Sequence, residues 1–212
     1  MMKLLMVFAG PHGSGKSTVF ENAREEMRLP RIRINPDTFI AHKASGQARD
    51  ALAEASRLRK AAFALGESFA FETISSLAVM RQAKALGYHI ELSFFTTCDP
   101  EINKARVRRR VAEGGHNIPP NTIMAGYARS MSELAKAVSI ADVARVYDNS
   151  LDRADCTDDP PLLVLHKPAA GDIWLIPPSD RPAWVDTYLV EPLQQSGDLP
   201  IEPDSSVQPI SV

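Results

Sequence analysis

The chain has little cysteine: Cys98 and Cys156 are the two thiols among 212 residues. Two cysteines do not make the disulfide framework of a small secreted domain, and free thiols fit the reducing cytosol, so we expect a cytoplasmic protein. No apolar run approaches the roughly 18–20 residues of a membrane helix, so we expect no membrane partner. The apolar N-terminus is short and lacks a small-residue cleavage site, which argues against a secretory signal.

An excess of positive charge is missing as well. Lysine and arginine number 24 against 26 aspartates and glutamates, which gives a net charge of −2. Nucleic acid as a main partner normally goes with a basic excess, so we expect no nucleic-acid partner. Internal repeats and low-complexity tracts are also lacking. The length and composition are typical of a globular protein with one full core.

Buried strands and helices alternate along the first 150 residues. The run "LLMVFA" is typical of a strand buried on both faces, and "QARDALAEASRLRKAAFAL" of a helix that ends at Gly66. Strands joined by helices pair in parallel, which predicts an α/β fold with a doubly wound, mostly parallel sheet over residues 1–150. Strands are predicted at 4–9, 31–35, 68–74, 88–97 and 143–147, and helices at 17–27, 47–65, 77–86, 100–113 and 121–140.

The composition changes after Ser150. Ten of the sixteen prolines lie between Pro160 and Pro209. The segments "PLLVLHK" and "DIWLIPP" are predicted to pair as a hairpin packed on the main domain, within a proline-rich extension of residues 151–193. Residues 194–212 have too little apolar content to order themselves and are predicted to form a flexible tail.

The segment "GPHGSGKS" matches the P-loop pattern G-x-x-x-x-G-K-[ST], between a predicted strand and a predicted helix. Its glycines allow consecutive backbone N–H groups to converge on phosphate oxygens, and the next helix presents its positive dipole end to the same anion. Lys16 is placed for the β- and γ-phosphates of ATP, and Ser17 is the expected Mg²⁺ ligand. The predicted nucleotide-binding residues are Gly10, Pro11, His12, Gly13, Ser14, Gly15, Lys16, Ser17 and Thr18.

Two other signatures separate the classes of P-loop protein. The "LSGGQ" sequence of ABC-type ATPases is absent, and "NKAR" at 103–106 lacks the aspartate of the guanine-specific N-K-x-D motif. A basic helix and a glycine loop late in the domain are more typical of a small-molecule kinase. Such kinases use arginines to neutralise the charge on the phosphoryl group in transfer.

A kinase for a hydroxyl acceptor needs a carboxylate that accepts the hydroxyl proton. Asp37 follows the second predicted strand and is the candidate base, with helix N-capping as the alternative. Glu72 lies in the apolar stretch "FAFETI", where an unpaired carboxylate is costly, so it is a second candidate; an exposed strand end is its alternative. Asp99 precedes Pro100 and is interpreted as a helix cap.

The basic candidates lie in "KARVRRRVAEGGHNIP" and on the helix that follows it. Arg106 and Arg110 share one helix face and are assigned to phosphate contact, with a solvated basic face as the alternative. Arg108 is assigned to solvent. Arg129, in "GYARSMSEL", is a further candidate for phosphate contact. His116 is a candidate substrate contact, with packing inside its loop as the alternative.

Five motifs in this order resemble the zeta-toxin family of P-loop kinases, above all its compact bacterial members. They are "GPHGSGKST", "NPD" at 35–37, "GESFAFETI" at 66–74, "GGHNIP" at 114–119 and "YDNS" at 147–150. The resemblance covers about residues 3–150. It implies ATP-dependent phosphorylation of a sugar hydroxyl on a nucleotide sugar, typically UDP-N-acetylglucosamine, and an antitoxin protein as a candidate partner.

Roles carried over by this resemblance place ATP and Mg²⁺ on Lys16 and Ser17, make Asp37 the base, and put Glu72 with Thr73 at the substrate. The sequence departs from the family in "GGHNIP", where zeta toxins have an arginine near the position of His116. Arg129 does not align cleanly with a second family arginine. Two other hypotheses therefore stay open: a kinase of another hydroxylated metabolite, and a nucleotide-binding regulatory ATPase without a small-molecule acceptor.

Overall fold

A computed structural model of the chain describes residues 2–19, 29–36, 48–115, 117–150 and 160–199. Their strands form one seven-stranded sheet in the order β2-β3-β1-β4-β5-β6-β7. The first five strands of this order are parallel, and β6 and β7 are antiparallel. The strands are β1 (Leu4–Ala9), β2 (Ile32–Ile34), β3 (Phe69–Thr73), β4 (His89–Thr96), β5 (Val143–Asp148), β6 (Leu162–Lys167) and β7 (Trp174–Leu175).

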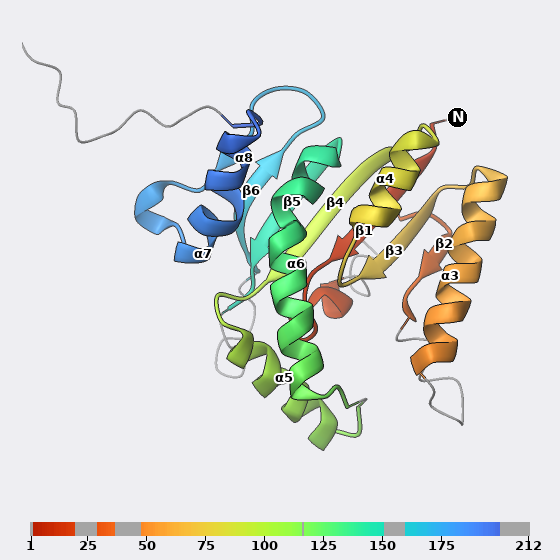
Figure 1. Cartoon of the computed structure of the whole chain (residues 1–212), viewed down its shortest axis with the longest axis horizontal. Helices are drawn as coiled ribbons and strands as arrows, with labels where there is room; N and C mark the ends of the chain where they lie inside the picture. The colour runs from red at the N-terminus through yellow and green to blue at the C-terminus, as the bar shows by residue number, and fades with distance from the viewer. Residues whose placement is uncertain (1, 20–28, 37–47, 116, 151–159, 200–212) are drawn as a thin grey trace, which may run out of the picture.

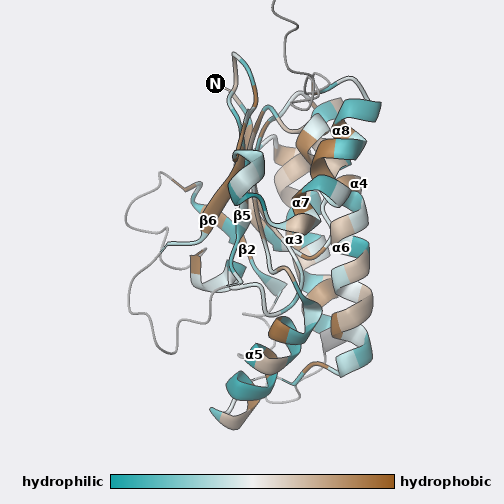
Figure 2. Cartoon of the chain, turned by 90° about the vertical axis from the view of Figure 1, so that its left-hand side faces the viewer, coloured by the Kyte–Doolittle hydropathy of each residue, from teal (hydrophilic) through white to brown (hydrophobic). Residues whose placement is uncertain are grey.

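Helices lie mainly on one face of this sheet, where Figure 2 shows α3, α4, α6, α7 and α8 side by side. Asp99 caps α5 as predicted, because its side chain accepts the N–H of Glu101 at 2.8 Å. The bounds are α3 (Ala48–Leu65), α4 (Leu77–Ala85), α5 (Pro100–Ala112), α6 (Pro120–Ile140), α7 (Ala183–Val185) and α8 (Glu191–Gln195), with a π-helical turn at Asp186–Val190 between the last two. Lys16–Val19 begin a further helix.

The alternating side chains of β1 explain why its sequence is apolar throughout. Leu5, Val7 and Ala9 face the helices in the main core, whereas Met6 and Phe8 belong to a second apolar cluster on the other face. A strand in the middle of a covered parallel sheet is buried on both sides, so no polar alternation is left. The predicted α/β fold with a mostly parallel sheet is therefore confirmed.

The C-terminal segment extends the same sheet (Figure 1). β6 pairs with β5, and β7 pairs with β6 so that Leu165 lies opposite Leu175. Trp184 and Leu193 belong to the main core, and Leu199 packs against it. The tail predicted from residue 194 thus includes a packed stretch up to Leu199, while residues 200–212 lie outside the described part of the chain.

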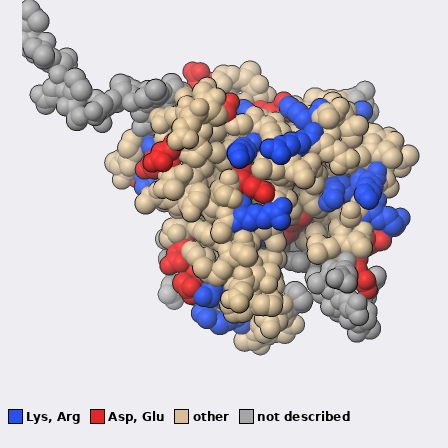
Figure 3. Space-filling model, in the orientation of Figure 1, with Lys and Arg blue, Asp and Glu red and all other residues tan. Residues whose placement is uncertain are grey.

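Charged side chains are mixed on the helix-covered face. Figure 3 shows lysines and arginines in separate groups with aspartates and glutamates among them. This distribution agrees with the near-neutral composition, and the described residues form no continuous basic surface on that face. Among the helices of the described residues, none is both long and apolar enough to span a bilayer.

Candidate functional site

The glycine loop joins β1 to the helix that begins at Lys16. Gly10 donates its N–H to Thr73 O at 3.2 Å, which ties the start of the loop to the end of β3. Gly13 has φ +74°, and a Cβ there would lie 2.6 Å from the carbonyl oxygen of Asn103. Gly13 is therefore required both by the left-handed backbone and by the close approach of α5.

Two asparagines from distant elements support the loop from outside. Asn103, in α5, donates from Nδ2 to His12 O at 2.6 Å, and Thr97 donates its hydroxyl to Asn103 Oδ1. Asn149, just after β5, donates from Nδ2 to Ser14 O at 2.8 Å. Sequence reasoning assigned no role to either residue; the signal for Asn149 was its place in the motif "YDNS" at 147–150, just beyond the predicted strand 143–147.

Tyr127 of α6 holds Thr97, the residue that donates its hydroxyl to Asn103. Its hydroxyl donates to Thr97 O at 2.6 Å in a buried position. Burial, as the main cause, raises the pKa of Tyr127 to about 12. The phenol therefore stays neutral at ordinary pH, and its role here is to donate a hydrogen bond rather than to exchange protons.

A buried carboxylate faces the loop from β3. Glu72 is 3% exposed; its Oε1 accepts the hydroxyl of Ser17 at 2.7 Å and its Oε2 accepts Asn35 Nδ2 at 2.7 Å. Lys16 Nζ lies 3.9 Å from Glu72 Oε1 and donates to Pro11 O at 3.0 Å. Paired partners of this kind offset the cost of burying charge, so Glu72 is not an exposed strand end.

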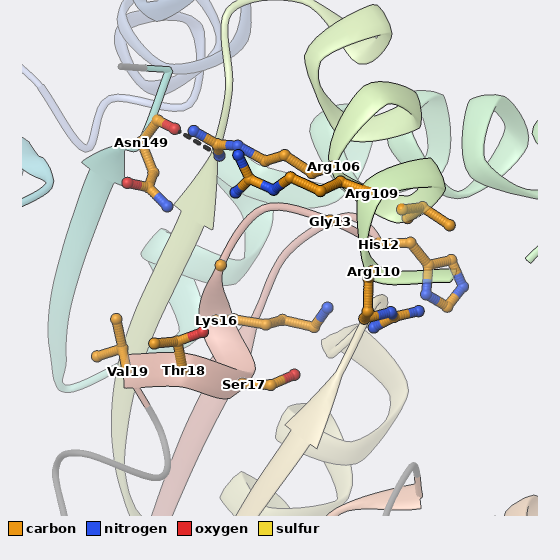
Figure 4. A pocket seen from close by; sticks show the side chains of 12 residues that line it. His12, Gly13, Lys16, Ser17, Thr18, Val19, Arg106, Arg109, Arg110 and Asn149 are labelled. Carbon is orange, nitrogen blue, oxygen red and sulfur yellow. Dashed lines mark hydrogen bonds between the residues drawn. The ribbon is translucent and has the colours of Figure 1, made fainter. Parts of the chain in front are cut away.

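Three arginines of α5 reach the pocket beside the loop. In Figure 4, Arg106 and Arg109 extend from the helix toward Asn149, whereas Arg110 lies nearer to His12. Arg106 donates from Nη1 to Asn149 O at 2.8 Å. Arg106 and Arg110 line the cavity together, as their shared helix face predicts, and Arg109 joins them although the sequence suggested no role for it. The cavity of about 290 Å³ is lined by His12, Gly13, Gly15, Lys16, Ser17, Thr18, Val19, Arg106, Val107, Arg109, Arg110 and Asn149.

Other predicted residues lie elsewhere. Arg129 does not line this pocket; its side chain is 68% exposed on α6 and pairs with Glu133 at 3.2 Å. Thr73 donates its hydroxyl to Ser75 O at 2.8 Å in the turn after β3. Asp37 and His116 lie outside the described residues.

The sheet order and the glycine loop together define a class of protein. A five-stranded parallel core, with a glycine loop between its central strand and a helix, is a P-loop kinase-like fold. Residues 2–156 match the zeta-toxin family. The chain belongs to this family.

One curated relative, an uncharacterized protein of Haemophilus influenzae (strain ATCC 51907 / DSM 11121 / KW20 / Rd), is 30% identical over 137 residues, which are 60% of this chain and 94% of that protein. A structure of AvrRxo1-ORF1:-ORF2 with ATP has a TM-score of 0.63 at 15% identity, over 82% of this chain and 61% of the other. A structure of AvrRxo1-ORF1:AvrRxo1-ORF2 with sulphate ions has a TM-score of 0.62 at 14% identity, over 84% of this chain and 62% of the other. The chain thus spans about three fifths of the AvrRxo1 chain, and this likeness shows the shared fold.

Proposed function

We propose that this protein is an ATP-dependent kinase that transfers the γ-phosphoryl group to a hydroxyl of a nucleotide sugar related to UDP-N-acetylglucosamine. The observation that supports phosphotransfer most directly is the contact of Ser17 and Lys16 with the buried Glu72, beside a cavity lined by three arginines. Membership of the zeta-toxin family supports the choice of acceptor.

The glycine loop and Lys16 hold the triphosphate in this proposal. The triphosphate would sit at the start of the helix at Lys16, where the free N–H groups of a first turn and the helix dipole favour an anion. The ammonium group of Lys16 is buried with Glu72 at the same place, so it can move to the β- and γ-phosphates without leaving the loop. Arg106 and Arg110 face the transferring group from the other wall and neutralise its charge.

The donor set around Ser17 fits Mg²⁺. Mg²⁺ prefers oxygen ligands and takes one or two from protein, with water and phosphate oxygens completing its shell. The hydroxyl of Ser17 and the carboxylate of Glu72, 2.7 Å apart, offer such oxygens. When bound there, the ion would neutralise charge on the β- and γ-phosphates. Glu72 also orients the Ser17 hydroxyl, a role that it plays with or without metal.

Asp37 is the proposed base. The acceptor hydroxyl gives its proton to the Asp37 carboxylate while its oxygen bonds to the γ-phosphorus and the bond from that phosphorus to the β-phosphate oxygen breaks, leaving ADP. Support comes from Asn35, two residues earlier, whose contact with Glu72 brings the end of β2 to the loop. Arg129 and Thr73 lie toward the same side, near the turn after β3, and are assigned to the acceptor rather than to ATP.

The test is a transfer assay with ATP, Mg²⁺ and UDP-N-acetylglucosamine, read by mass spectrometry as a product one phosphoryl group heavier. We expect Asp37→Asn to abolish transfer while MgATP still binds. Lack of product across nucleotide sugars, nucleosides and coenzymes would refute the kinase assignment. Transfer to a different member of that panel would support the kinase reaction and show that the acceptor is not UDP-N-acetylglucosamine. Unchanged turnover in Asp37→Asn would show that Asp37 is not the base.

A further inference from the structure

Besides the pairing of β6 with β5, the C-terminal segment makes a buried side-chain hydrogen bond to the end of β5. Trp184, in α7, is 6% exposed, and its indole Nε1–H donates to Asp148 Oδ2 at 2.6 Å. Asp148, the last residue of β5, is itself 7% exposed. Trp184 lies beyond residues 2–156, the part that matches the family, so no role follows for it from that match.

Asp148 fixes the backbone on both sides of the next residue. While Oδ2 accepts from Trp184, Oδ1 accepts the backbone N–H of Ser150 at 2.7 Å. Asn149, which lies between them, donates its own N–H to Thr96 O at 2.7 Å. The N–H groups of Asn149 and Ser150 are therefore held by two hydrogen bonds, and one of these depends on a carboxylate whose other oxygen is bound by the C-terminal segment.

Asn149 in turn reaches both walls of the nucleotide pocket. Its side-chain amide supports the glycine loop at Ser14 O, 2.8 Å away, and its carbonyl oxygen accepts from Arg106 Nη1 at 2.8 Å. A Cβ on Gly15 would lie 2.3 Å from Asn149 Nδ2, so the fit between the two segments is close. A shift of Asn149 would thus disturb both the glycine loop and Arg106.

We propose that Trp184 is a positioning residue for nucleotide binding, which acts through Asp148 and Asn149 on the glycine loop and Arg106. A buried carboxylate that loses a donor is driven to rearrange toward water or another donor, because its desolvation is no longer offset. The rearrangement would weaken the hydrogen bond from the Ser150 N–H to Asp148, which leaves Ser150 with its contact to the Cys98 N–H and lets Asn149 shift. The C-terminal segment therefore completes the nucleotide site. This inference rests on the proposed function, because it takes the loop to bind ATP.

The test compares two substitutions of the same kind, Trp184→Phe and Trp174→Phe. Trp174 lies on β7 and is 47% exposed, so it serves as the matched control. We expect Trp184→Phe to weaken MgATP binding about tenfold in isothermal titration calorimetry, from the loss of a hydrogen bond to a charged group. Trp174→Phe should leave the affinity within about twofold. Far-UV circular dichroism checks that both variants remain folded.

A double-mutant cycle with Asn149→Ala separates positioning from general loss of stability. If Trp184 acts through Asn149, adding Trp184→Phe to Asn149→Ala should weaken binding by less than tenfold, because the contact with Ser14 is already gone and only the contact of the backbone carbonyl with Arg106 is left to disturb. Independent, multiplying effects would overturn the proposal, as would unchanged affinity in folded Trp184→Phe. Should that variant not fold, Asp148→Asn tests the same path: its amide can accept from only one of the two donors, and unchanged MgATP affinity there refutes the inference.

Failure of the proposed function gives a different result. A wild-type protein that does not bind MgATP refutes the nucleotide site and the inference together. Wild-type binding, with both tryptophan variants equal to wild type, refutes only the role of Trp184. MgATP binding that responds to Trp184→Phe, without transfer to any acceptor, supports the positioning role and places the error in the kinase assignment.

Discussion

The two ends of the sheet both gather charged side chains around a cavity, yet they differ in how these charges are used. At the carboxyl end lies the glycine loop. At the amino end, Lys84 pairs with Asp142 at 2.5 Å, and Lys167 donates to Val138 O and Ser139 O at the end of α6. The cavity beside these groups measures about 660 Å³, larger than the one at the loop. Cavity size therefore does not identify the functional end.

What distinguishes the carboxyl end is the backbone. Gly10, Gly13 and Gly15 of the glycine loop have positive φ, and Asn103 and Asn149 donate to the carbonyls of His12 and Ser14. At the amino end the lysines instead cap a helix and pair with an acid, which are ordinary roles in stabilising a fold. The comparison predicts that equal substitutions at the two ends affect activity at one end and only stability at the other.

The largest contrast is expected from the two lysines. Lys16→Ala should lower phosphoryl transfer about thousandfold, because the proposed function assigns this cation to the transferring phosphates. Lys84→Ala should leave transfer within about twofold, since it removes one exposed ion pair. Steady-state transfer rates, with circular dichroism as the folding control, give the measurement. Similar losses in both variants would show that the two ends do not differ as argued.

The two acids give the second contrast. Glu72→Gln keeps an acceptor for Ser17 but places an amide opposite Asn35 Nδ2, where two donors now meet. We expect transfer to fall about a hundredfold, with MgATP affinity measured alongside at several Mg²⁺ concentrations. Asp142→Asn is the control at the amino end and should transfer at the wild-type rate. A fully active Glu72→Gln would show that transfer does not need the negative charge of Glu72.

Local signals in the sequence predict a large part of this arrangement. The apolar run of β1 and the glycines after it are set by burial on both faces and by backbone conformation, so residues 4–17 were predictable. The same holds for α3, whose observed start differs from the predicted one by a single residue. Such features depend on neighbours in the chain and therefore leave a pattern there.

Features that depend on distant pairs left no such pattern. Asn103 and Asn149 contact the loop across 91 and 135 residues, and an asparagine after a strand or in a helix has many ordinary roles. Glu72 was recognisable as a costly buried acid, but its pairing with Asn35 required knowing that β2 lies beside β3. Helical spacing grouped Arg106 with Arg110, whereas the presence of Arg109 in the pocket depends on how α5 approaches the loop.

Two glycines with nearly equal backbone angles sharpen the comparison at the level of stability. Gly13 and Gly87 have φ of +74° and +75°. Alanine at Gly87 would meet nothing within 4 Å, whereas at Gly13 it would meet the Asn103 carbonyl at 2.6 Å. Gly87→Ala should lower the free energy of unfolding by about 1 kcal/mol, from the left-handed backbone alone. Gly13→Ala should cost about 2 kcal/mol more through overpacking. Urea unfolding measures both, and equal costs would contradict the close packing of α5 on the loop.

The smallest effect concerns pH at the amino end. Burial opposes ionisation of Asp142, but hydrogen bonds from Lys84 and from the N–H of Ile90, with the nearby charges of Lys84 and His89, outweigh it and lower the pKa of Asp142 below the usual 3.8. A lowered pKa in the folded state means that the unfolded chain binds the proton first as pH falls. The stability that Asp142 provides is therefore complete above about pH 5 and lost as pH drops through the folded-state pKa.

Asp142→Asn tests this point because it removes the titrating group; its amide keeps one acceptor oxygen, so the contact with either Lys84 or the N–H of Ile90 is lost as well. The wild type should exceed the variant in free energy of unfolding by less than about 1 kcal/mol at pH 7, since the pair is partly exposed. The difference should shrink as the pH falls below 3.8 and through the lowered folded-state pKa of Asp142. Urea unfolding at several pH values measures it. A difference that stays constant across this range would mean that the ion pair with Lys84 contributes nothing. MgATP affinity at pH 7 should be the same in both proteins, because every partner of Asp142 lies at the amino end, away from the glycine loop.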